Sequence, residues 1–512
     1  MEATRTNTLR MTSWLFAAML ATGGVVDVAQ GQQRTWNGGG ETNLWSDDDN
    51  WSENPGNPYT GGDGAIWELG SSDAQLDTEM DQAYNIERIQ FYNYDFTINS
   101  ADDNILSLRG AGNGQTLLVG TGGVNAVPVS ATINVPVHLT ARATASSTDP
   151  FKIFDVRPGS ELIFNDEITS NAFNIRRAGP GSITFNASSP DMANIYDIAN
   201  GDTYLGSETA LGSATIRHTS GNNIRILSNT GSAMSLSNNM ELGGGGAITF
   251  TQAGGPDMTL TGDISLLGGT KAFGVSDGTT LTIDGVISGD GGLSKNVAGD
   301  MVLTADNTFT GGTFIANGRL INHGSLVSDV SVVGGSAVLT GAGAIGGLQM
   351  GGGVVSPGSD TTVATLNASG DSSFLAGSGR YRVNLADAAS SAGLGWDLIN
   401  ITGLLEILAG DEPGDVFTIE LLGDGANFDN TDYGQLFTIA SASEGIDGFD
   451  AAMFAVNTDN FGVDLNGGSF VVQMDGNDLN LAFIPEPGSL ALLGGAAGLM
   501  LLRRRERSFV AG

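Results

Sequence analysis

The sequence has no cysteine, so no disulfide can stabilise it. Small secreted domains commonly depend on disulfides because their hydrophobic cores are too small to hold the fold alone. A chain of 512 residues has room for two to four ordinary domains or for one long repeat structure. We therefore expect stability to come from a large core or from repeats that stack on one another.

Basic residues are also scarce. The chain has 21 Lys and Arg against 56 Asp and Glu, which gives a formal net charge of −35. Nucleic-acid binding needs a basic face, and direct adhesion to anionic lipid needs positive charge, so both are disfavoured. The favoured interpretation of the acidity is solubility and mutual repulsion. Binding of a divalent cation such as Ca²⁺ across the acidic surface stays open as an alternative.

Residues suited to catalysis or metal binding are few. The three histidines, His138, His218 and His323, lie far apart, and no nucleophile elbow or Ser/His/Asp order is present. Zinc is disfavoured because cysteine is absent and the histidines are scattered. A G-x-G-x-x-G match at 341–346 lacks the strand-then-helix setting that phosphate binding needs. The sequence therefore predicts that the chain is not an enzyme and has no metal site.

Two short acidic runs, 47–49 and 102–103, are the places where Ca²⁺ could bind. Neither has the spacing of an EF-hand loop or of a calcium-binding nonapeptide repeat. We favour solvated acidic loops for both.

Residues 1–31 have the pattern of a secretory signal peptide. Two arginines precede an apolar stretch at 14–21, and Ala29 and Gly31 occupy the small-residue positions of a signal-peptidase site. The pattern predicts cleavage after Gly31 by signal peptidase, and export of the chain. A membrane anchor that is never cut is the alternative, which the short apolar run disfavours.

The last thirty residues combine three features in a fixed order. Pro485, Glu486 and Pro487 come first, and an uncharged run at 488–502 follows. The run ends in four arginines, Arg503, Arg504, Arg505 and Arg507. Arginines at the end of a membrane helix stay on the cytoplasmic side, so we expect everything upstream to lie outside. As a helix the run is about 22 Å long, short of the ~30 Å hydrocarbon core. A permanent short anchor and a buried core helix are the alternatives.

This tail resembles the PEP-CTERM sorting signal of exported bacterial proteins, over about the last thirty residues. The resemblance implies handling by an exosortase, a membrane peptidase that would act near the Pro-Glu-Pro sequence. It also implies transient or permanent retention by the C-terminal helix, and a location in the cell envelope, at the outer surface or in the extracellular matrix.

The middle of the chain predicts β-structure. Glycine is abundant, with 77 residues, and short alternating segments recur between turns rich in Gly, Asn and Asp. Residues 182–188, 247–254 and 280–289 alternate apolar and polar side chains, which is typical of half-buried strands. Strands at this close spacing over some 400 residues favour either a set of β-sandwiches or a β-solenoid, in which each coil packs on the next.

One segment favours the solenoid. Residues 291–322 read GGLSKNVAGDMVLTADNTFTGGTFIANGRLIN, and they resemble the autotransporter-associated β-strand repeat. The matching positions are Gly292, Leu293, Lys295, Gly299, Val302, Leu303, Asn307, Phe309, Gly311, Gly312, Thr313, Ile315, Gly318 and Leu320. The resemblance is specific for fold and says nothing of activity.

The repeat has a physical interpretation. Its glycines are expected to turn the corners, and Asn307 is expected to bond its amide to turn backbone or to an asparagine in the next coil. The apolar positions expected to fill a stacked interior are Leu293, Val302, Phe309, Ile315 and Leu320. The fold class that follows is all-β, with an elongated right-handed parallel β-helix body. Coils of 20–25 residues at about 4.8 Å each predict a rod of about 80–100 Å.

Three further regions extend the resemblance. Residues 341–360 and 396–408 resemble elements that follow such repeats in autotransporter passenger domains. The start of the exported body, with Trp36, Trp45 and Trp51, resembles the start of related exported repeat proteins and is expected to cap one end. A single apolar run stands where autotransporters have their translocating barrel. We therefore expect export by the signal peptide and sorting by the tail.

These patterns predict five segments, with a C-terminal β-rich unit following the repeats. The segments are a signal peptide at 1–31, a solenoid-like region at 32–285, the repeat region at 286–410, the β-rich unit at 411–482 and the sorting tail at 483–512.

The predicted function is that of an exported structural or interaction protein without catalytic activity, with extracellular polysaccharide as a candidate partner. Two alternatives stay open. One is a carbohydrate-binding adhesin that holds sugars on Trp36, Trp45 and Trp51. The other is a β-helix polysaccharide lyase, which would need basic side chains and a carboxylate cluster together on one coil face.

Overall fold

The structure is a computed structural model in which strands make up almost all of the regular structure. The described residues are 33–52, 66–69 (backbone only), 76–110, 115–121, 127–140, 151–170, 173–192, 194–377, 379–408, 412, 414–431 and 433–485. The predicted signal peptide with its Ala29–Gly31 site, and the tail from Glu486 onward with its apolar run and arginines, lie outside them. Within the described ranges, no helix has the length and apolar character needed to cross a membrane.

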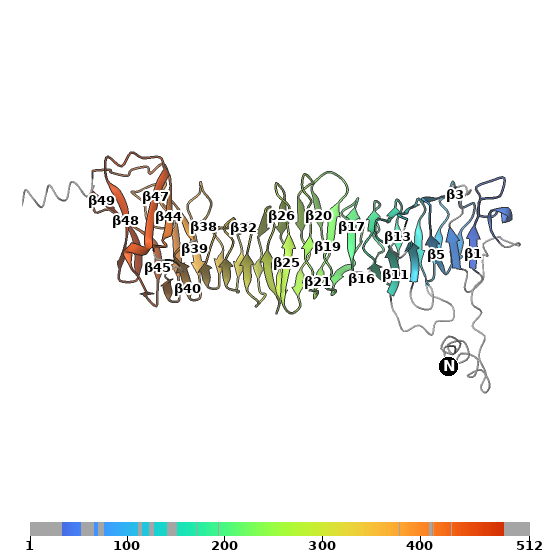
Figure 1. The fold of residues 1–512 in the computed structure, drawn as a ribbon, viewed down its shortest axis with the longest axis horizontal. Coiled ribbons are helices and arrows are strands. Elements are labelled where there is room, and N and C mark those ends of the chain that lie inside the picture. Colours follow the sequence, from blue (N-terminus) through green and yellow to red (C-terminus); the bar gives the residue numbers. More distant parts are fainter. Residues whose placement is uncertain are drawn as a thin grey trace, which may run out of the picture.

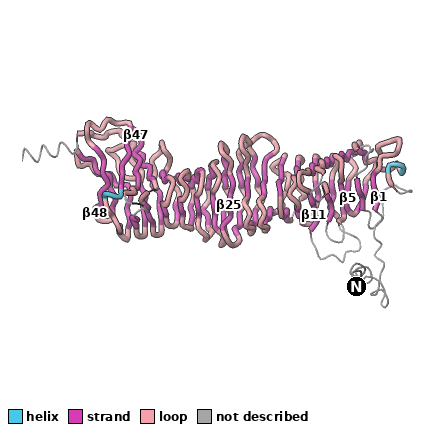
Figure 2. Tube along the Cα trace, viewed as in Figure 1, coloured by secondary structure: helices cyan, strands magenta, loops and turns pink. Residues whose placement is uncertain are grey.

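The described chain forms one elongated stack of coils, with its N-terminal strands at one end and its C-terminal strands at the other (Figure 1). Strands alternate with loops along the whole length, and the two short 3-10 turns, η1 (Asp48–Asn50) and η2 (Ala451–Met453), lie near opposite ends (Figure 2). A typical coil gives one strand to each of three sheets. The prediction of an all-β fold with long parallel sheets is confirmed.

Sheets A and C belong to the N-terminal part of the stack, and both are parallel throughout. Sheet A has the order β1 (Gln33–Trp36), β2 (Ile66–Leu69), β5 (Arg88–Phe91), β8 (Gln115–Val119), β11 (Phe151–Val156), β14 (Asn174–Ala178), β16 (Ile195–Ile198), β18 (Thr215–His218), β21 (Met240–Leu242), β24 (Ile264–Leu266) and β27 (Ile287–Gly289). Sheet C has the order β13 (Ile168–Thr169), β10 (Val137–Leu139), β7 (Leu106–Leu108) and β4 (Tyr84–Ile86).

Sheet B runs through almost the whole stack and ties its two halves together. Its sixteen parallel strands are β3 (Asp77–Glu79), β6 (Phe96–Asn99), β9 (Ser130–Ile133), β12 (Glu161–Phe164), β15 (Ser182–Phe185), β17 (Gly201–Leu205), β19 (Ile224–Ser228), β22 (Ile248–Thr249), β25 (Thr270–Gly274), β28 (Gly292–Lys295), β31 (Thr313–Ile315), β34 (Val330–Val332), β37 (Leu348–Met350), β40 (Ser372–Leu375), β43 (Leu405–Leu408) and β46 (Ile446–Asp447).

Sheets D and E complete the C-terminal part. Sheet D has the order β20 (Met234–Leu236), β23 (Met258–Leu260), β26 (Thr280–Ile283), β29 (Asp300–Leu303), β32 (Gly318–Asn322), β35 (Ala337–Gly341), β38 (Val354–Pro357), β41 (Arg380–Asn384), β44 (Phe417–Gly423) and β47 (Phe454–Phe461). Sheet E has the order β30 (Asp306–Asn307), β33 (Ser325–Leu326), β36 (Ala344–Ile345), β39 (Thr365–Ala368), β42 (Leu398–Ile401), β45 (Leu436–Ala442), β49 (Asp478–Ile484) and β48 (Ser469–Asp475).

Coil length differs between the middle and the ends of the stack. In the middle, the Ile287 N–H donates to the side chain of Asn307, 20 residues away, and the Asp263 N–H donates to Asn239, 24 residues away. The expected coil of 20–25 residues holds for these coils, whereas the coils that follow are shorter, with Arg319 19 residues from Asp300 and Gly347 18 residues from Asp329. Near the ends the partners are 35 and 38 residues apart, because loops are inserted. Fifteen steps of about 4.8 Å make sheet B about 72 Å long, shorter than the expected rod.

The interior is a continuous column of apolar side chains, because successive strand residues point to opposite faces and every inward one meets its counterpart in the next coil. Stacked rings are prominent in the N-terminal half. The ring centroids of Phe164 lie 5.7 Å from those of Phe154 and 5.4 Å from those of Phe185, within the range of favourable aromatic pairs. The interior position expected for Val302 is wrong. Met301 and Leu303 are the buried residues of β29, and Val302 lies between them on the other face.

Asparagine and aspartate side chains join one coil to the next at the corners. The carboxylate of Asp329 accepts the Gly347 N–H at 2.6 Å, and that of Asp371 accepts the Leu404 N–H at 2.9 Å. These bonds satisfy backbone groups that the strand ladders leave unpaired at the turns. Some of the aspartates that the sequence analysis attributes to solubility therefore have a structural role, because their carboxylates join neighbouring coils.

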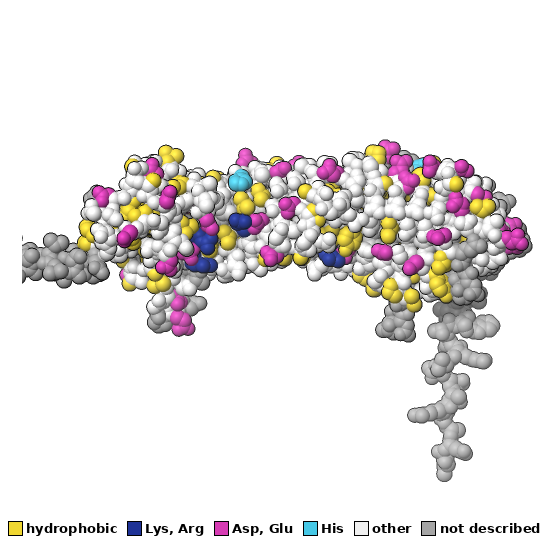
Figure 3. Space-filling model, turned by 90° about the horizontal axis from the view of Figure 1, so that it is seen from above, with side chains coloured by type: hydrophobic (Ala, Val, Ile, Leu, Met, Phe, Trp, Pro, Cys, Tyr) yellow, Lys and Arg dark blue, Asp and Glu magenta, His cyan; other side chains and the backbone are white. Residues whose placement is uncertain are grey.

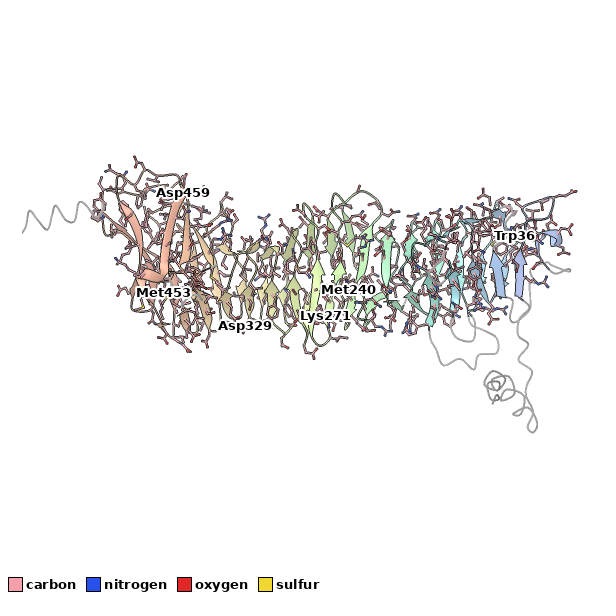
Figure 4. All side chains as sticks on the ribbon, in the orientation of Figure 1. Trp36, Met240, Lys271, Asp329, Met453 and Asp459 are labelled. Carbon is pink, nitrogen blue, oxygen red and sulfur yellow. The ribbon has the colours of Figure 1, made fainter. Side chains whose placement is uncertain are left out.

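Tryptophans close the N-terminal end. Trp36 and Trp51 meet edge to face with centroids 4.9 Å apart, and the Trp51 indole N–H donates to the Trp45 carbonyl at 3.0 Å. All three side chains are buried, and Trp36 lies at one extremity of the stack (Figure 4). The expected cap is confirmed. The alternative that these three tryptophans hold sugars on an exposed surface is wrong, because no ring face is open to solvent.

The C-terminal end is closed by antiparallel strands. The stack continues past residue 411, since β44 pairs with β41 and β47 pairs with β44, both in parallel. Strand β49 then runs antiparallel to β45, and β48 runs antiparallel to β49. A cluster of phenylalanine rings packs under this closure; it consists of Phe428, Phe437, Phe461, Phe470 and Phe483. Closure of this kind protects sheet edges that would otherwise be open.

Candidate ligand-binding groove

The repeat residues identified in the sequence lie in two consecutive coils, where they have structural roles. The side chain of Asn307 is buried, accepts the Ile287 N–H at 2.8 Å and donates to the Ala305 carbonyl at 2.8 Å. It therefore bonds to turn backbone, one of its two expected roles, and not to another asparagine. Thr313 shares a hydroxyl hydrogen bond of 2.9 Å with Ser328 in the next coil. The buried apolar repeat residues are Leu293, Leu303, Phe309, Ile315 and Leu320.

The repeat glycines sit where backbone approaches backbone. Gly318 has a φ of 70°, a left-handed conformation that glycine adopts without strain. A Cβ at Gly311 would collide with the backbone of Gly291 and Gly292 in the preceding coil. The other repeat glycines, Gly292, Gly299 and Gly312, line the same corners.

Lysines cap the corners from inside. The chain has three, Lys152, Lys271 and Lys295, and all three are buried. The Lys295 ammonium donates to the Val297 carbonyl and, at 3.2 Å, to the Asn317 carbonyl. Burial lowers the pKa of both Lys152 and Lys295 to about 8, because the charged form loses its hydration.

Lys152 and Lys271 bond in the same manner as Lys295. The Lys152 ammonium donates to the Arg109 carbonyl and lies 4.3 Å from the Phe173 ring centroid. The Lys271 ammonium donates to the Gly243 carbonyl at 3.3 Å and to the Gly268 carbonyl. Arg177 is an arginine of this type, with a guanidinium that donates to carbonyls of its own corner, including that of Ala178 at 2.9 Å. These cations hold the corners of the coils together.

The fold does not bring the three histidines together with one another or with Asp47. His218 is buried with its Nδ1 2.8 Å from the Ile198 carbonyl, and His138 and His323 lie in other coils. Asp47 caps the turn η1, and the hydrogen bond from Thr42 lowers its pKa. In the part of the chain that the structure describes, no group of three His, Cys, Asp or Glu side chains could hold a metal ion.

The G-x-G-x-x-G match at 341–346 runs from the end of β35 into β36 of the next sheet, with no helix after it. Gly341 instead forms a two-way backbone pair with Gly358. These residues therefore have no helix N-terminus that could hold a phosphate.

A groove on the outer face of sheet D gathers side chains that are far apart in the sequence. It has a volume of about 410 Å³ and crosses five neighbouring strands, β29, β32, β35, β38 and β41. Its lining residues are Ala298, Asp300, Gly318, Arg319, Ser336, Val338, Thr340, Ser356, Ser359, Asp360, Thr361 and Arg382. Sheet D lies along the upper side of Figure 1, and Figure 3 looks onto it; there, basic side chains gather beside acidic ones near β32 and β38.

Ion pairs fix the charged groups of this groove. The Arg319 guanidinium donates two hydrogen bonds, of 2.6 and 3.1 Å, to the Asp300 carboxylate on the neighbouring strand. Arg382 donates to both oxygens of Asp360, at 3.1 and 3.2 Å, and to Glu420 at 2.8 Å. Glu420 also accepts from Arg380 at 3.3 Å. Three guanidinium groups thus face three carboxylates. The hydrogen bond with Asp300 raises the pKa of Arg319 above its ordinary value.

Sequence reasoning missed this cluster. Its arginines and carboxylates are spread from residue 300 to residue 420, and only the parallel register of sheet D brings them together. That register pairs Asp300 with Arg319 and Arg382 with Glu420. The alternating pattern of β29, β32 and β41 places these residues on the outer face, but coil lengths of 19 and 38 residues conceal which ones meet.

A ladder of asparagines was also missed. Each amide donates to the carboxamide oxygen of the asparagine before it, at 2.6 to 3.0 Å, along one outer corner next to sheet B. The members are Asn99, Asn134, Asn165, Asn186 and Asn229. The sequence carried a signal, since four of these residues stand at the end of a short strand or directly after it, in the pattern T-I-N or I/T-F-N.

Comparisons with known proteins do not assign a family. A scan against protein-family models finds no match, and a search of curated proteins finds no relative.

Proposed function

We propose that this chain is an exported structural and interaction protein of the cell surface or extracellular matrix, and that it has no catalytic activity. The observation that carries the proposal is sheet B, which runs without a break from β3 to β46 and makes the described body one rod. A rod of this kind displays surface at a distance from its attachment point and contacts partners along its length.

The two sequence termini support the location that we propose. The pattern of residues 1–31 favours export, and the tail from Pro485 resembles a PEP-CTERM signal read by an exosortase-like membrane peptidase. The last strand, β49, ends at Ile484, directly before that tail, so the rod would be attached by its C-terminal end. We propose that residues 488–502 form a single apolar helix and that the coils wind in the right-handed sense, as parallel crossovers nearly always do.

One feature of sheet D bears on the alternative that the chain is a polysaccharide lyase. The outer face of sheet D does bring basic and acidic side chains together on neighbouring coils, the arrangement that a polysaccharide lyase requires. Each of these arginines, however, is already hydrogen-bonded to a carboxylate. A base and a charge neutraliser need side chains that can reach substrate, so we favour binding over catalysis at this face.

The proposal is tested by removing residues 486–512, which leaves every described strand intact. We expect the truncated protein to leave the envelope fraction and appear in the medium. The matching experiment places residues 485–512 behind an unrelated exported reporter, which should then be retained and processed. If the truncated chain localises and is processed like the complete one, the proposed sorting is wrong.

A further inference from the structure

The groove on sheet D has the dimensions of a site for an extended ligand. Its five strands are neighbours in one parallel sheet, so the groove runs about 19 Å along the rod, at about 4.8 Å per strand. The strand β38 and the loop after it, with Ser359, Asp360 and Thr361, line one part, and the turns before β29 and β35 and the start of β32 line another. A volume of about 410 Å³ falls within the usual range of ligand sites.

The groove presents donors and acceptors side by side. Arginine carries only donors and a carboxylate carries only acceptors, and the Arg319–Asp300 pair places them 2.6 to 3.1 Å apart. A sugar hydroxyl donates one hydrogen bond and accepts others, so a neighbouring donor and acceptor satisfy it fully. Thr340, Ser356 and Ser359 also line the groove, where the Thr340 hydroxyl donates to the Gly358 carbonyl and the Ser356 hydroxyl donates to Asp360. This lining suits a ligand rich in hydroxyl groups.

Charge decides between neutral and acidic sugars. Arg319, Arg380 and Arg382 are balanced by Asp300, Asp360 and Glu420, so the cluster has no net charge. A carboxylated or sulfated sugar would have to displace one of these carboxylates from its arginine, and the chain around it has a net charge of −35. An uncharged ligand meets neither penalty, because it bonds at the edges of pairs that stay intact.

We propose that the groove binds a stretch of linear, uncharged polysaccharide, laid along the rod axis over strands β29 to β41. The inference rests on the proposed function, because a rod outside the cell meets such polymers in the matrix. The paired arginines then serve as fixed donors, and the carboxylates hold them in place before the ligand arrives, which lowers the ordering cost of binding.

The experiment measures binding of soluble hexasaccharides to the purified full-length chain in mild detergent by calorimetry. Cellohexaose, maltohexaose and laminarihexaose are the uncharged test ligands, and hexagalacturonate is the acidic one. We expect at least one uncharged ligand to bind, and to bind at least about tenfold more tightly than hexagalacturonate, a difference of about 1.4 kcal/mol. Arg319→Ala should weaken that binding about tenfold.

Arg225→Ala is the matched control. Arg225 forms a paired hydrogen-bonded contact with Asp202 on the outer face of sheet B. The two side chains are about as exposed as those of Arg319 and Asp300, but the pair lies outside the groove. Its loss should leave binding unchanged within twofold. The inference is overturned if no uncharged ligand binds, if hexagalacturonate binds best, or if Arg225→Ala and Arg319→Ala weaken binding equally. Each of these results leaves the sorting experiment unaffected, so the two proposals fail separately.

Discussion

The corners inside the coils and the faces outside them use positive charge in opposite ways. Inside, Lys152, Lys271 and Lys295 donate to backbone carbonyls, and within the described ranges no carboxylate is bonded to their ammonium groups. Outside, Arg225 and Arg319 form cross-coil pairs with aspartates. A flexible ammonium with three donors fits converging carbonyls, whereas a planar guanidinium fits a carboxylate. The few basic residues are thus divided by shape, with lysines at the inner corners and paired arginines on the outer faces.

The largest effect is expected in chemical labelling of the lysine amines, because buried amines should not react at all while the protein is folded. The chain has four amines, counting three lysines and the amino terminus. We expect an amine-reactive N-hydroxysuccinimide ester to label only the amino terminus of the folded protein, and all four amines in urea, because buried amines react only through opening of the structure. Mass spectrometry counts the labels. Rapid labelling of two or more lysines in the folded protein would contradict buried lysines.

The next prediction compares the two classes by substitution. Lys295→Ala removes a buried stem and leaves the Val297 and Asn317 carbonyls without their donor, so we expect a loss of about 3 kcal/mol in urea unfolding. Arg225→Ala removes a partly exposed pair and should cost about 0–1 kcal/mol. Lys295→Met keeps the stem and should fall between them. Equal losses of stability for Lys295→Ala and Arg225→Ala would contradict the difference between buried lysines and exposed arginine pairs.

The pH dependence of stability should also carry the signature of the buried lysines. The pKa of Lys152 and that of Lys295 are about 8 in the folded protein, below the unfolded value of about 10.4, so the unfolded chain binds more protons between these values. Stability should therefore rise from pH 8 to pH 10. The pKa of buried Asp397, which desolvation raises to about 8, lies at the lower edge of this window.

The check is the urea midpoint of the full chain at pH 8, 9 and 10. Lys295→Met should remove roughly half of the rise, because Lys152 still titrates. Above pH 10 the gain should reverse, since burial raises the pKa values of Tyr84 and Tyr196 above that of the unfolded chain. A flat or falling profile between pH 8 and pH 10 would show that the lysine amines are solvated.

The smallest effect is expected at the outer ladder. Asn165 bonds to Asn134 and to Asn186, so Asn165→Ala should cost about 1 kcal/mol in urea unfolding. Asn229 has a single ladder bond and is the control, with about half that loss expected. If Asn229→Ala costs as much as Asn165→Ala, the bonds along the ladder do not add.

Much of the fold could be predicted from the sequence because strand alternation and glycine corners are local. The repeat at 291–322 indicated stacked coils, and the tryptophans near the start indicated a cap. Val302 was misplaced because an apolar residue on the outer face of a strand looks the same in the sequence as one on the inner face. Coil lengths failed near the ends, where inserted loops leave no periodic trace.

The groove could not be predicted, for a different reason. Asp300 and Arg319 are one coil apart, but Arg382 and Glu420 are 38 residues apart, and only the observed register shows that all four share a face. Pairing in a parallel sheet depends on the length of every intervening loop. The asparagine ladder could have been predicted, since Asn99 ends a short strand and Asn134, Asn165 and Asn186 each directly follow one.

The central claim is that one acidic rod is delivered outside the cell and handled at its C-terminal end. The mass of the mature protein recovered from the envelope or the medium tests it most directly. We predict a chain that begins after Gly31 and ends close to Pro485, with all residues of the described strands retained. Recovery from the cytosol of the complete 52.5 kDa chain, uncut at both ends, would contradict the account.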